Sequence, residues 1–298
     1  MYKNLFTLTL IASSLSAYAQ STDVQNIDDA DASTHDIERI LVSGDFREVT
    51  LDQLSASATI LNQARLSSRQ PSHIDSVLNS VPNVNFTAGA SRGRFIQIRG
   101  IGERSQFAEP INPSVSFIVD EFDFSGLAAA GLIFDTQQLD VYRGPQATLY
   151  GTGALAGAVK LSSNKVGSES PKYVEARLGS KDSYRVEAAA GDDINTDWGY
   201  RVALVHNRSD GFVENTYLNR DDTNNIDETA MRLSVEGNAD ERTTLAFTYR
   251  WYDIDNGYDA FSLDNDNKTL SDEPGFDEHQ THAVSARSTT RTHAGDFI

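Results

Sequence analysis

The sequence contains no cysteine. This absence excludes disulfide frameworks, thiolate zinc sites, iron–sulfur clusters and cysteine nucleophiles. Basic residues are also scarce, with 25 Lys and Arg against 43 Asp and Glu and a formal net charge of −18. Because such an excess of negative charge repels phosphate groups, we expect no nucleic-acid partner. Beyond residue 20, no apolar run reaches the length of about 18 residues that a membrane-spanning helix needs.

The first nineteen positions have the pattern of an export signal. Lys3 is followed by an apolar stretch at 5–15 and then by Ala17-Tyr18-Ala19. A positive start, a short apolar core and small residues before the cleavage point are typical of a secretory signal peptide. We therefore predict a signal peptide over 1–19, with a buried N-terminal helix as the alternative.

Residues 20–53 form a predicted flexible leader, which the family resemblance described below places in the periplasm. Its first part, 20–36, is rich in Asp, Ser, Thr, Gln and Asn and has too few apolar residues to offset the entropy of ordering. The run Ile40-Leu41-Val42 near its middle is prone to form a strand. From the residues alone, an edge strand of the next domain is favoured over a docking peptide that adds to a partner's sheet.

Residues 54–165 have the mixed pattern of a small α+β domain with glycine-rich loops. A helix is expected over 73–79, capped by Ser72 and closed by Pro82. Apolar and alternating runs predict four strands, at 95–99, 115–119, 139–143 and 158–162.

From 172 to 298 the pattern changes to alternation with period two. Apolar side chains at every second position, with flanks, give runs close to the roughly 9–11 residues of a tilted transmembrane strand. Short connections alternate with long polar ones, as in outer-membrane barrels, and the short turn at 179–183 should share the end of the long loops. A soluble β-sandwich is the alternative, since its strands also alternate. The alternating runs lie at 184–190, 200–205, 231–236 and 245–251.

No motif predicts an enzyme, a cofactor site or a metal site. The glycine-rich stretch 151–157 has the wrong spacing for a dinucleotide loop and precedes a strand rather than a helix. The stretch 264–268 begins like a calcium loop, but Lys268 occupies a ligand position. His279 and His282 lie where a loop should meet a strand, and a metal pair there is not favoured.

Four stretches of the mixed domain resemble the plug of TonB-dependent outer-membrane receptors. The sequence departs from the family pattern at Glu121, where glycine is usual, and at Thr152-Gly153, where Arg-Asn is common. The four stretches are Ile98-Arg99-Gly100-Ile101-Gly102, Val119-Asp120-Glu121, Val141-Tyr142-Arg143-Gly144-Pro145-Gln146-Ala147-Thr148-Leu149-Tyr150-Gly151 and Ala154-Leu155-Ala156-Gly157-Ala158-Val159.

The resemblance implies a plug domain inside a roughly 22-stranded antiparallel transmembrane β-barrel of the Gram-negative outer membrane, in contact with its lipid. It implies energy-coupled uptake of a scarce ligand, with an iron–siderophore favoured. It also changes the interpretation of 38–44, which is similar to the family's TonB box. The implied partner is TonB, energised by ExbB and ExbD at the inner membrane.

Site residues also follow from the resemblance. Strand pairing with TonB is implied for Ile40, Leu41, Val42 and Ser43. Ion pairs with barrel carboxylates are implied for Arg99 and Arg143. Ligand contacts are implied in the outward loops of the plug, at Arg104, Gln106, Phe107, Glu109, Asp123 and Phe124.

The residues after Pro171 suffice for about six strands, too few to close such a barrel. Because lipid does not tolerate open sheet edges, we expect a truncated N-terminal part of a receptor. Arg99 or Arg143 should then lack its barrel carboxylate within this chain. The competing hypothesis is an exported soluble protein that binds a ligand or partner without transport.

Overall fold

The computed structural model describes residues 41–42, 49–50, 56–88, 91–104, 113–258, 262, 264, 266–292 and 295–298. The chain divides into two units, Met1–Glu38 and Arg39–Ile298, and every described residue belongs to the second. The predicted signal peptide and most of the leader lie outside the described residues, as do Gln106, Phe107 and Glu109. In the described part of the chain, no helix is both long and apolar enough to cross a membrane.

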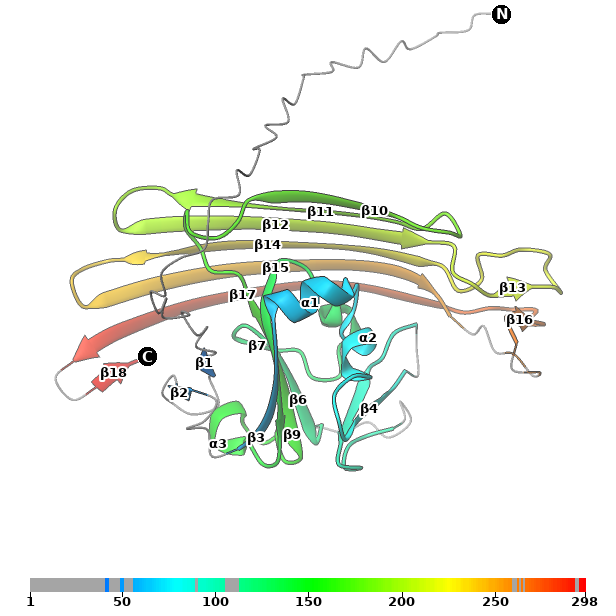
Figure 1. The fold of residues 1–298 in the computed structure, drawn as a ribbon, viewed down its shortest axis with the longest axis horizontal. Helices are drawn as coiled ribbons and strands as arrows, with labels where there is room; N and C mark the ends of the chain where they lie inside the picture. Colours follow the sequence, from blue (N-terminus) through cyan, green and yellow to red (C-terminus); the bar gives the residue numbers. More distant parts are fainter. Residues whose placement is uncertain are drawn as a thin grey trace, which may run out of the picture. The chain divides into compact units, whose positions relative to one another are not determined.

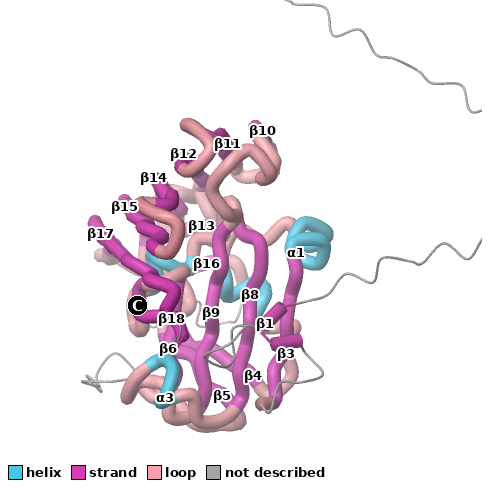
Figure 2. Tube along the Cα trace, turned by 90° about the vertical axis from the view of Figure 1, so that its left-hand side faces the viewer, coloured by secondary structure: helices cyan, strands magenta, loops and turns pink. Residues whose placement is uncertain are grey.

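The first folded part, here called the small domain (57–163), is built on a five-stranded sheet (Figures 1 and 2). The central strand pair β6 and β9 is parallel and the other pairs are antiparallel. All five residues of β6 are buried, as its nearly continuous apolar sequence predicts. The strand order is β3 (Ser57–Asn62), β8 (Thr136–Arg143), β9 (Gly157–Ser163), β6 (Val115–Val119) and β7 (Phe122–Asp123), beside a hairpin of β4 (Val84–Thr87) and β5 (Phe95–Ile98).

Short helices complete the small domain. The helix predicted at 73–79 is α2 (Ile74–Leu78), and its cap is His73, whose ring accepts from the Asp75 backbone N–H. The prediction of Ser72 as the cap is wrong by one residue, because the helix begins at Ile74 and the residue before it is His73. The other helices are α1 (Gln63–Arg69), η1 (Ala128–Gly131) and α3 (Ala147–Tyr150).

The second part is a long antiparallel sheet whose strands follow one another in chain order (Figure 1). Five long strands and two short ones, β10 and β18, agree with the prediction of about six. The strands are β10 (Tyr173–Leu178), β11 (Tyr184–Asp193), β12 (Trp198–Ser209), β14 (Ile226–Asn238), β15 (Thr243–Gly257), β17 (Phe276–Thr292) and β18 (Gly295–Phe297).

The connections of the long sheet alternate between its two ends. The turn at 179–183 shares one end with the long connections 210–225 and 258–275, as parity predicted, and the Asp210 N–H donates to the Lys181 carbonyl at 3.0 Å. The two long connections also pair with each other. Within them, β13 (Glu214–Asn215) lies parallel to β16 (Lys268–Thr269), a contact that the sequence pattern does not predict.

The two faces of the long sheet differ in chemistry, which confirms the prediction of two-faced strands. On the outer face, apolar side chains are exposed, including Val174 at 80% and Leu178 at 88%. On the inner face, Ala203, Val205 and Tyr252 are buried in the same hydrophobic cluster as the core of the small domain. A soluble sandwich would cover its outer apolar face with a second sheet, and these side chains are uncovered among the described residues.

Candidate functional site

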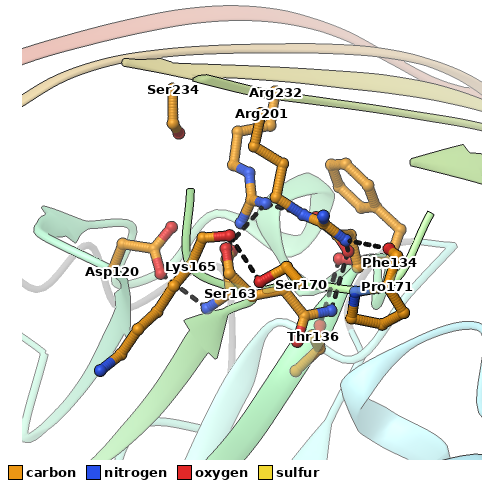
Figure 3. A network of polar contacts seen from close by, with 12 residues as sticks. Asp120, Phe134, Thr136, Ser163, Lys165, Ser170, Pro171, Arg201, Arg232 and Ser234 are labelled. Carbon is orange, nitrogen blue, oxygen red and sulfur yellow. Dashed lines mark hydrogen bonds and ion pairs between the residues drawn. The ribbon is translucent and has the colours of Figure 1, made fainter. Parts of the chain in front are cut away.

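The small domain rests on the inner face of the long sheet through buried ion pairs, and we call this contact region the seam. Asp135 lies at its centre, between η1 and β8, and is 3% exposed. Arg201 donates to both of its carboxylate oxygens, from Nε at 2.7 Å and from Nη2 at 2.5 Å. Arg232 donates from Nη2 to the same carboxylate. Figure 3 shows both arginines reaching down from the sheet to the small domain.

The backbone of Asp135 is fixed as firmly as its side chain. The residue adopts a left-handed conformation with φ 47°, which Asp tolerates better than most residues. Its N–H donates to Glu187 of β11 at 2.9 Å, and its carbonyl accepts from the Asn164 N–H at 2.9 Å. Glu187 also accepts from Tyr173 and Arg185. The carboxylate therefore sits at one fixed position against the sheet.

A second carboxylate, Asp120, pairs with Arg250 of β15. Asp120 occupies the turn between β6 and β7, and Nη2 of Arg250 donates both to it and to the Ser163 hydroxyl. The Ser163 N–H donates to the other Asp120 oxygen at 2.8 Å. Burial raises the pKa of Asp120, but the charges of Arg250 and Arg232 outweigh it and the pKa lies below its usual value.

Glu121, which departs from the family's usual glycine, adds a contact to the seam. Its carboxylate accepts from the Ser285 hydroxyl at 2.9 Å and lies 3.0 Å from Nη1 of Arg287, both in β17. The turn at Asp120 and Glu121 thus contacts two neighbouring strands of the long sheet. The substitution of glycine adds an interaction rather than only altering a turn.

A further ion pair of the seam has the opposite polarity, with the arginine in the small domain. Arg92 donates to Glu228 of β14 through Nε at 2.6 Å and Nη2 at 2.7 Å. The amides of Asn207 and Asn256 each donate to the same carboxylate at 3.0 Å. The buried Glu228 is therefore satisfied on both oxygens.

The two arginines implied by the resemblance lie elsewhere. Arg143 donates within the small domain, to the Thr59 hydroxyl at 2.6 Å and the Ser57 hydroxyl at 3.2 Å. Arg99 is exposed and left-handed, with φ 54°. Neither has an ion pair among the described residues. Their pairing with barrel carboxylates stays a prediction.

Sequence reasoning missed the arginines that form the seam. Arg201, Arg232 and Arg250 fall on the polar side of alternating strands, so that periodicity placed them on the wet face. Their buried, paired state was not visible, because an arginine on such a face is ordinarily solvated. The sequence did contain one signal for the seam, because three adjacent strands each carry an arginine at an inner position.

Of the residues implied to contact the ligand, some lie on the surface and one lies in the core. Arg104 and Asp123 are exposed, and Asp123 accepts from the Ser125 backbone N–H at 2.9 Å. Phe124 is 7% exposed and packs edge-on to Tyr252 of β15, with ring centroids 5.8 Å apart. This ring therefore serves the seam rather than the surface. Near the loops lies a cavity of about 170 Å³, lined in part by Arg94, Glu103 and Ser125–Leu127.

One other predicted site can be placed in part. Leu41–Val42 forms a two-residue strand β1 that pairs antiparallel with β2 (Val49–Thr50), while Ile40 and Ser43 lie outside the described residues. Within the part of the chain that the structure describes, no group of three or more His, Asp or Glu could bind a metal ion.

Comparison with known proteins identifies relatives of this arrangement. Residues 50–158 match the family model described as TonB-dependent Receptor Plug Domain. The pesticin receptor of Yersinia pestis is 27% identical over 170 residues, covering 56% of this chain and 25% of that protein. The vitamin B12 transporter BtuB of Photobacterium profundum is 22% identical over 233 residues, covering 77% and 37%.

The solved structures resemble the fold in both of its parts. The ferric yersiniabactin uptake receptor FyuA of Yersinia pestis superimposes with a TM-score of 0.69 at 20% sequence identity. The match covers 80% of this chain and 39% of that one. The chain thus spans between 25% and 39% of the length of these three relatives.

Proposed function

We propose that the chain acts as part of a TonB-dependent receptor, whose plug domain model matches residues 50–158, in energy-coupled uptake of a scarce ligand across the outer membrane. An iron–siderophore is the favoured cargo. The name of FyuA specifies ferric yersiniabactin and that of BtuB specifies vitamin B12, so relatives of this chain take up chelated metals or metal-containing cofactors. No catalytic role is proposed for any residue.

The observation that carries this proposal is the chemistry of the seam. Besides the apolar contacts around Tyr252, the plug contacts the long sheet through arginine–carboxylate pairs centred on Asp120, Asp135 and Glu228. Polar pairs can exchange their partners for water when the two surfaces separate, whereas a purely apolar contact would expose its full hydrophobic area. A plug held this way suits a gate that must move and return.

The outer face of the long sheet supports the membrane location. Val174, Leu178 and Val284 are between 62% and 88% exposed, and neighbouring outer positions are also apolar. An exposed apolar surface of this kind is costly in water and suits contact with acyl chains. The competing hypothesis of a soluble exported binding protein does not account for it.

Docking to TonB is proposed at Ile40 to Ser43, with ExbB and ExbD supplying the energy. The backbone of Leu41 and Val42 pairs as a strand with Val49 and Thr50, which supports the capacity of this segment to add to a sheet. In the proposed cycle, pairing with TonB replaces the pairing with β2. Arg99 and Arg143 remain proposed contacts to barrel carboxylates in the receptor.

The test measures uptake in the native host. A strain lacking the gene should lose energy-dependent accumulation of a labelled iron(III) chelate, and the wild-type gene should restore it. Val42→Pro removes one backbone donor from the docking strand, so it should abolish accumulation and leave chelate binding at the cell surface unchanged. Accumulation that survives both Val42→Pro and collapse of the proton gradient would contradict the proposal.

A further inference from the structure

Three arginines on adjacent strands of the long sheet form what we call the arginine band. They are Arg201 in β12, Arg232 in β14 and Arg250 in β15, and each is at most 2% exposed. Arg232 is directly opposite Arg250 in the sheet, and Ala203, two residues from Arg201, is opposite Arg232. The band therefore runs across the strands on the face that the plug covers.

The band carries more positive charge than its partners neutralise. Asp135 accepts from both Arg201 and Arg232, and Asp120 accepts from Arg250. Three guanidinium groups thus face two carboxylates among the described residues. The nearby Arg185 does not change this balance, because it pairs with Glu187 two positions along its own strand. A buried cation in excess is unfavourable unless another group compensates it.

The band also has hydrogen-bond donors to spare. Nη1 of Arg201, Nε of Arg232 and Nε of Arg250 are buried and have no acceptor within the described part of the chain. An unpaired buried donor costs stability. Arginines whose only role is to hold the plug would therefore not be expected to keep one unpaired donor each. The arginine band thus has more hydrogen-bond donors than the described part of the plug has acceptors for them.

Both carboxylates that face the band belong to the plug. When the plug moves in the proposed transport cycle, Asp120 and Asp135 leave with it, and three guanidinium groups remain on the wall. Glu187 stays with Arg185 because both lie on β11. Guanidinium groups that have lost their carboxylate partners match the oxygens of carboxylates, catecholates and phosphates in geometry and charge.

We propose that the arginine band is the anion-recognising segment of the transport path, so that the cargo carries carboxylate or catecholate oxyanion groups. This inference rests on the proposed function. The long connections at the end of the sheet are rich in Asp and Glu, but they are exposed, and salt screens exposed charges beyond about 8 Å. The buried band is screened much less, and it therefore dominates the selection of the cargo by charge.

The test measures ion selectivity in a planar bilayer. The receptor, as its own gene encodes it, is inserted in the bilayer, and urea is added until the plug becomes sensitive to protease. A potassium chloride gradient then gives the ratio of chloride to potassium permeability. We expect chloride to be favoured, and we expect Arg232→Gln to lower the ratio about twofold or more, since one charge of three is lost.

Two variants separate this role from a structural one. Asp135→Asn breaks the ion pair that Arg232→Gln breaks, and the Arg201 pair as well, but it leaves the band complete, so its permeability ratio should equal that of the wild type or exceed it. Arg208→Gln removes an arginine of the same sheet that is 54% exposed, and it should leave the ratio unchanged. Arg232→Lys keeps the charge and should restore most of the selectivity.

Several results would overturn the inference. These are a potassium-selective wild type, a ratio that Arg232→Gln leaves unchanged, equal effects of Arg232→Gln and Asp135→Asn, or no conductance after the plug is released. Failure of the proposed function appears separately, as absent energy-dependent uptake in cells, because the bilayer measurement does not depend on TonB or on the cargo.

Discussion

Arg92 of the plug donates two parallel hydrogen bonds to Glu228 of the long sheet, at 2.6 and 2.7 Å. The side chains are 15% and 1% exposed. Because Asn207 and Asn256 also donate to Glu228, the carboxylate is fully enclosed by donors. The pair links residues 136 positions apart in sequence and fastens the plug near the end of the sheet that carries the long connections.

Replacing Arg92 should therefore loosen the plug. Arg92→Ala leaves a buried carboxylate without its cation, and breaking such a pair costs about 3–5 kcal/mol. Pulse proteolysis across a urea titration measures the free energy of plug unfolding. Lys172→Ala is the matched control, since both side chains of the Lys172–Asp192 pair are about half exposed and the pair should contribute much less than the Arg92–Glu228 pair. Equal losses in the two variants would contradict the importance of burial.

Asp140 should make plug stability depend on pH. The side chain is 1% exposed, and burial raises the pKa of its carboxyl from 3.8 to about 6, although Gln138 donates to it at 2.7 Å. Because the folded-state pKa lies above the unfolded value, the stabilising contribution is complete below about pH 4 and is lost as the pH rises through 6. The loss from pH 4 to pH 7.5 should be about 2–3 kcal/mol.

Asp140→Asn tests this dependence. The amide keeps a carbonyl acceptor for Gln138 but cannot ionise, so the variant should gain stability over the wild type as the pH rises. The measurement is the difference in the free energy of plug unfolding between variant and wild type at pH 4.5 and at pH 7.5. Asp123→Asn makes the same change of net charge at an exposed site. A difference for Asp140→Asn that is no larger than the control's would refute the assignment.

Much of the fold follows from local pattern. The runs at 115–119 and 139–143 are β6 and part of β8, since short runs of strand-forming residues next to turn residues such as Pro113 and Gly144 have few other stable outcomes. In the long sheet, period two placed Val186 and Phe247 on the outer face and Arg250 on the opposite one, and the structure agrees. These predictions needed only the side chains of one strand at a time.

The seam could not be predicted this way. Asp120 and Asp135 are two of 43 acidic residues, and in sequence they look like ordinary turn residues. Their role depends on partners 130 and 66 positions away, Arg250 and Arg201. The same limit applies to β13 and β16, two-residue strands that form only because two long connections meet. Contacts of this kind are set by tertiary packing, which leaves no periodic trace.

Gly157 should be irreplaceable in the plug. Its φ of +157° and its place at the start of β9 bring it against the neighbouring strand, where an added Cβ would lie 2.2 Å from the Tyr142 carbonyl oxygen. Gly157→Ala must push β8 and β9 apart, so we expect a loss of about 3 kcal/mol in the free energy of plug unfolding. Gly126→Ala, with φ +78° and open space around the Cβ, should lose only about 1 kcal/mol from backbone strain. Similar losses would show that strain rather than collision limits both sites.

Phe247 provides the test of the lipid-facing surface. Its side chain is 43% exposed on the outer face of β15, in line with the outer positions of neighbouring strands. Phe247→Arg should destabilise the folded receptor by about 2–4 kcal/mol in a bilayer, because a lipid-facing charge near the midplane has no partner. The preceding residue, Ala246, is on the inner face, opposite Glu236. Ala246→Arg adds the same charge there and should fold normally. Folding into vesicles, followed by heat-modifiable mobility on gels, distinguishes the two variants, and equal folding yields would place the outer face in water.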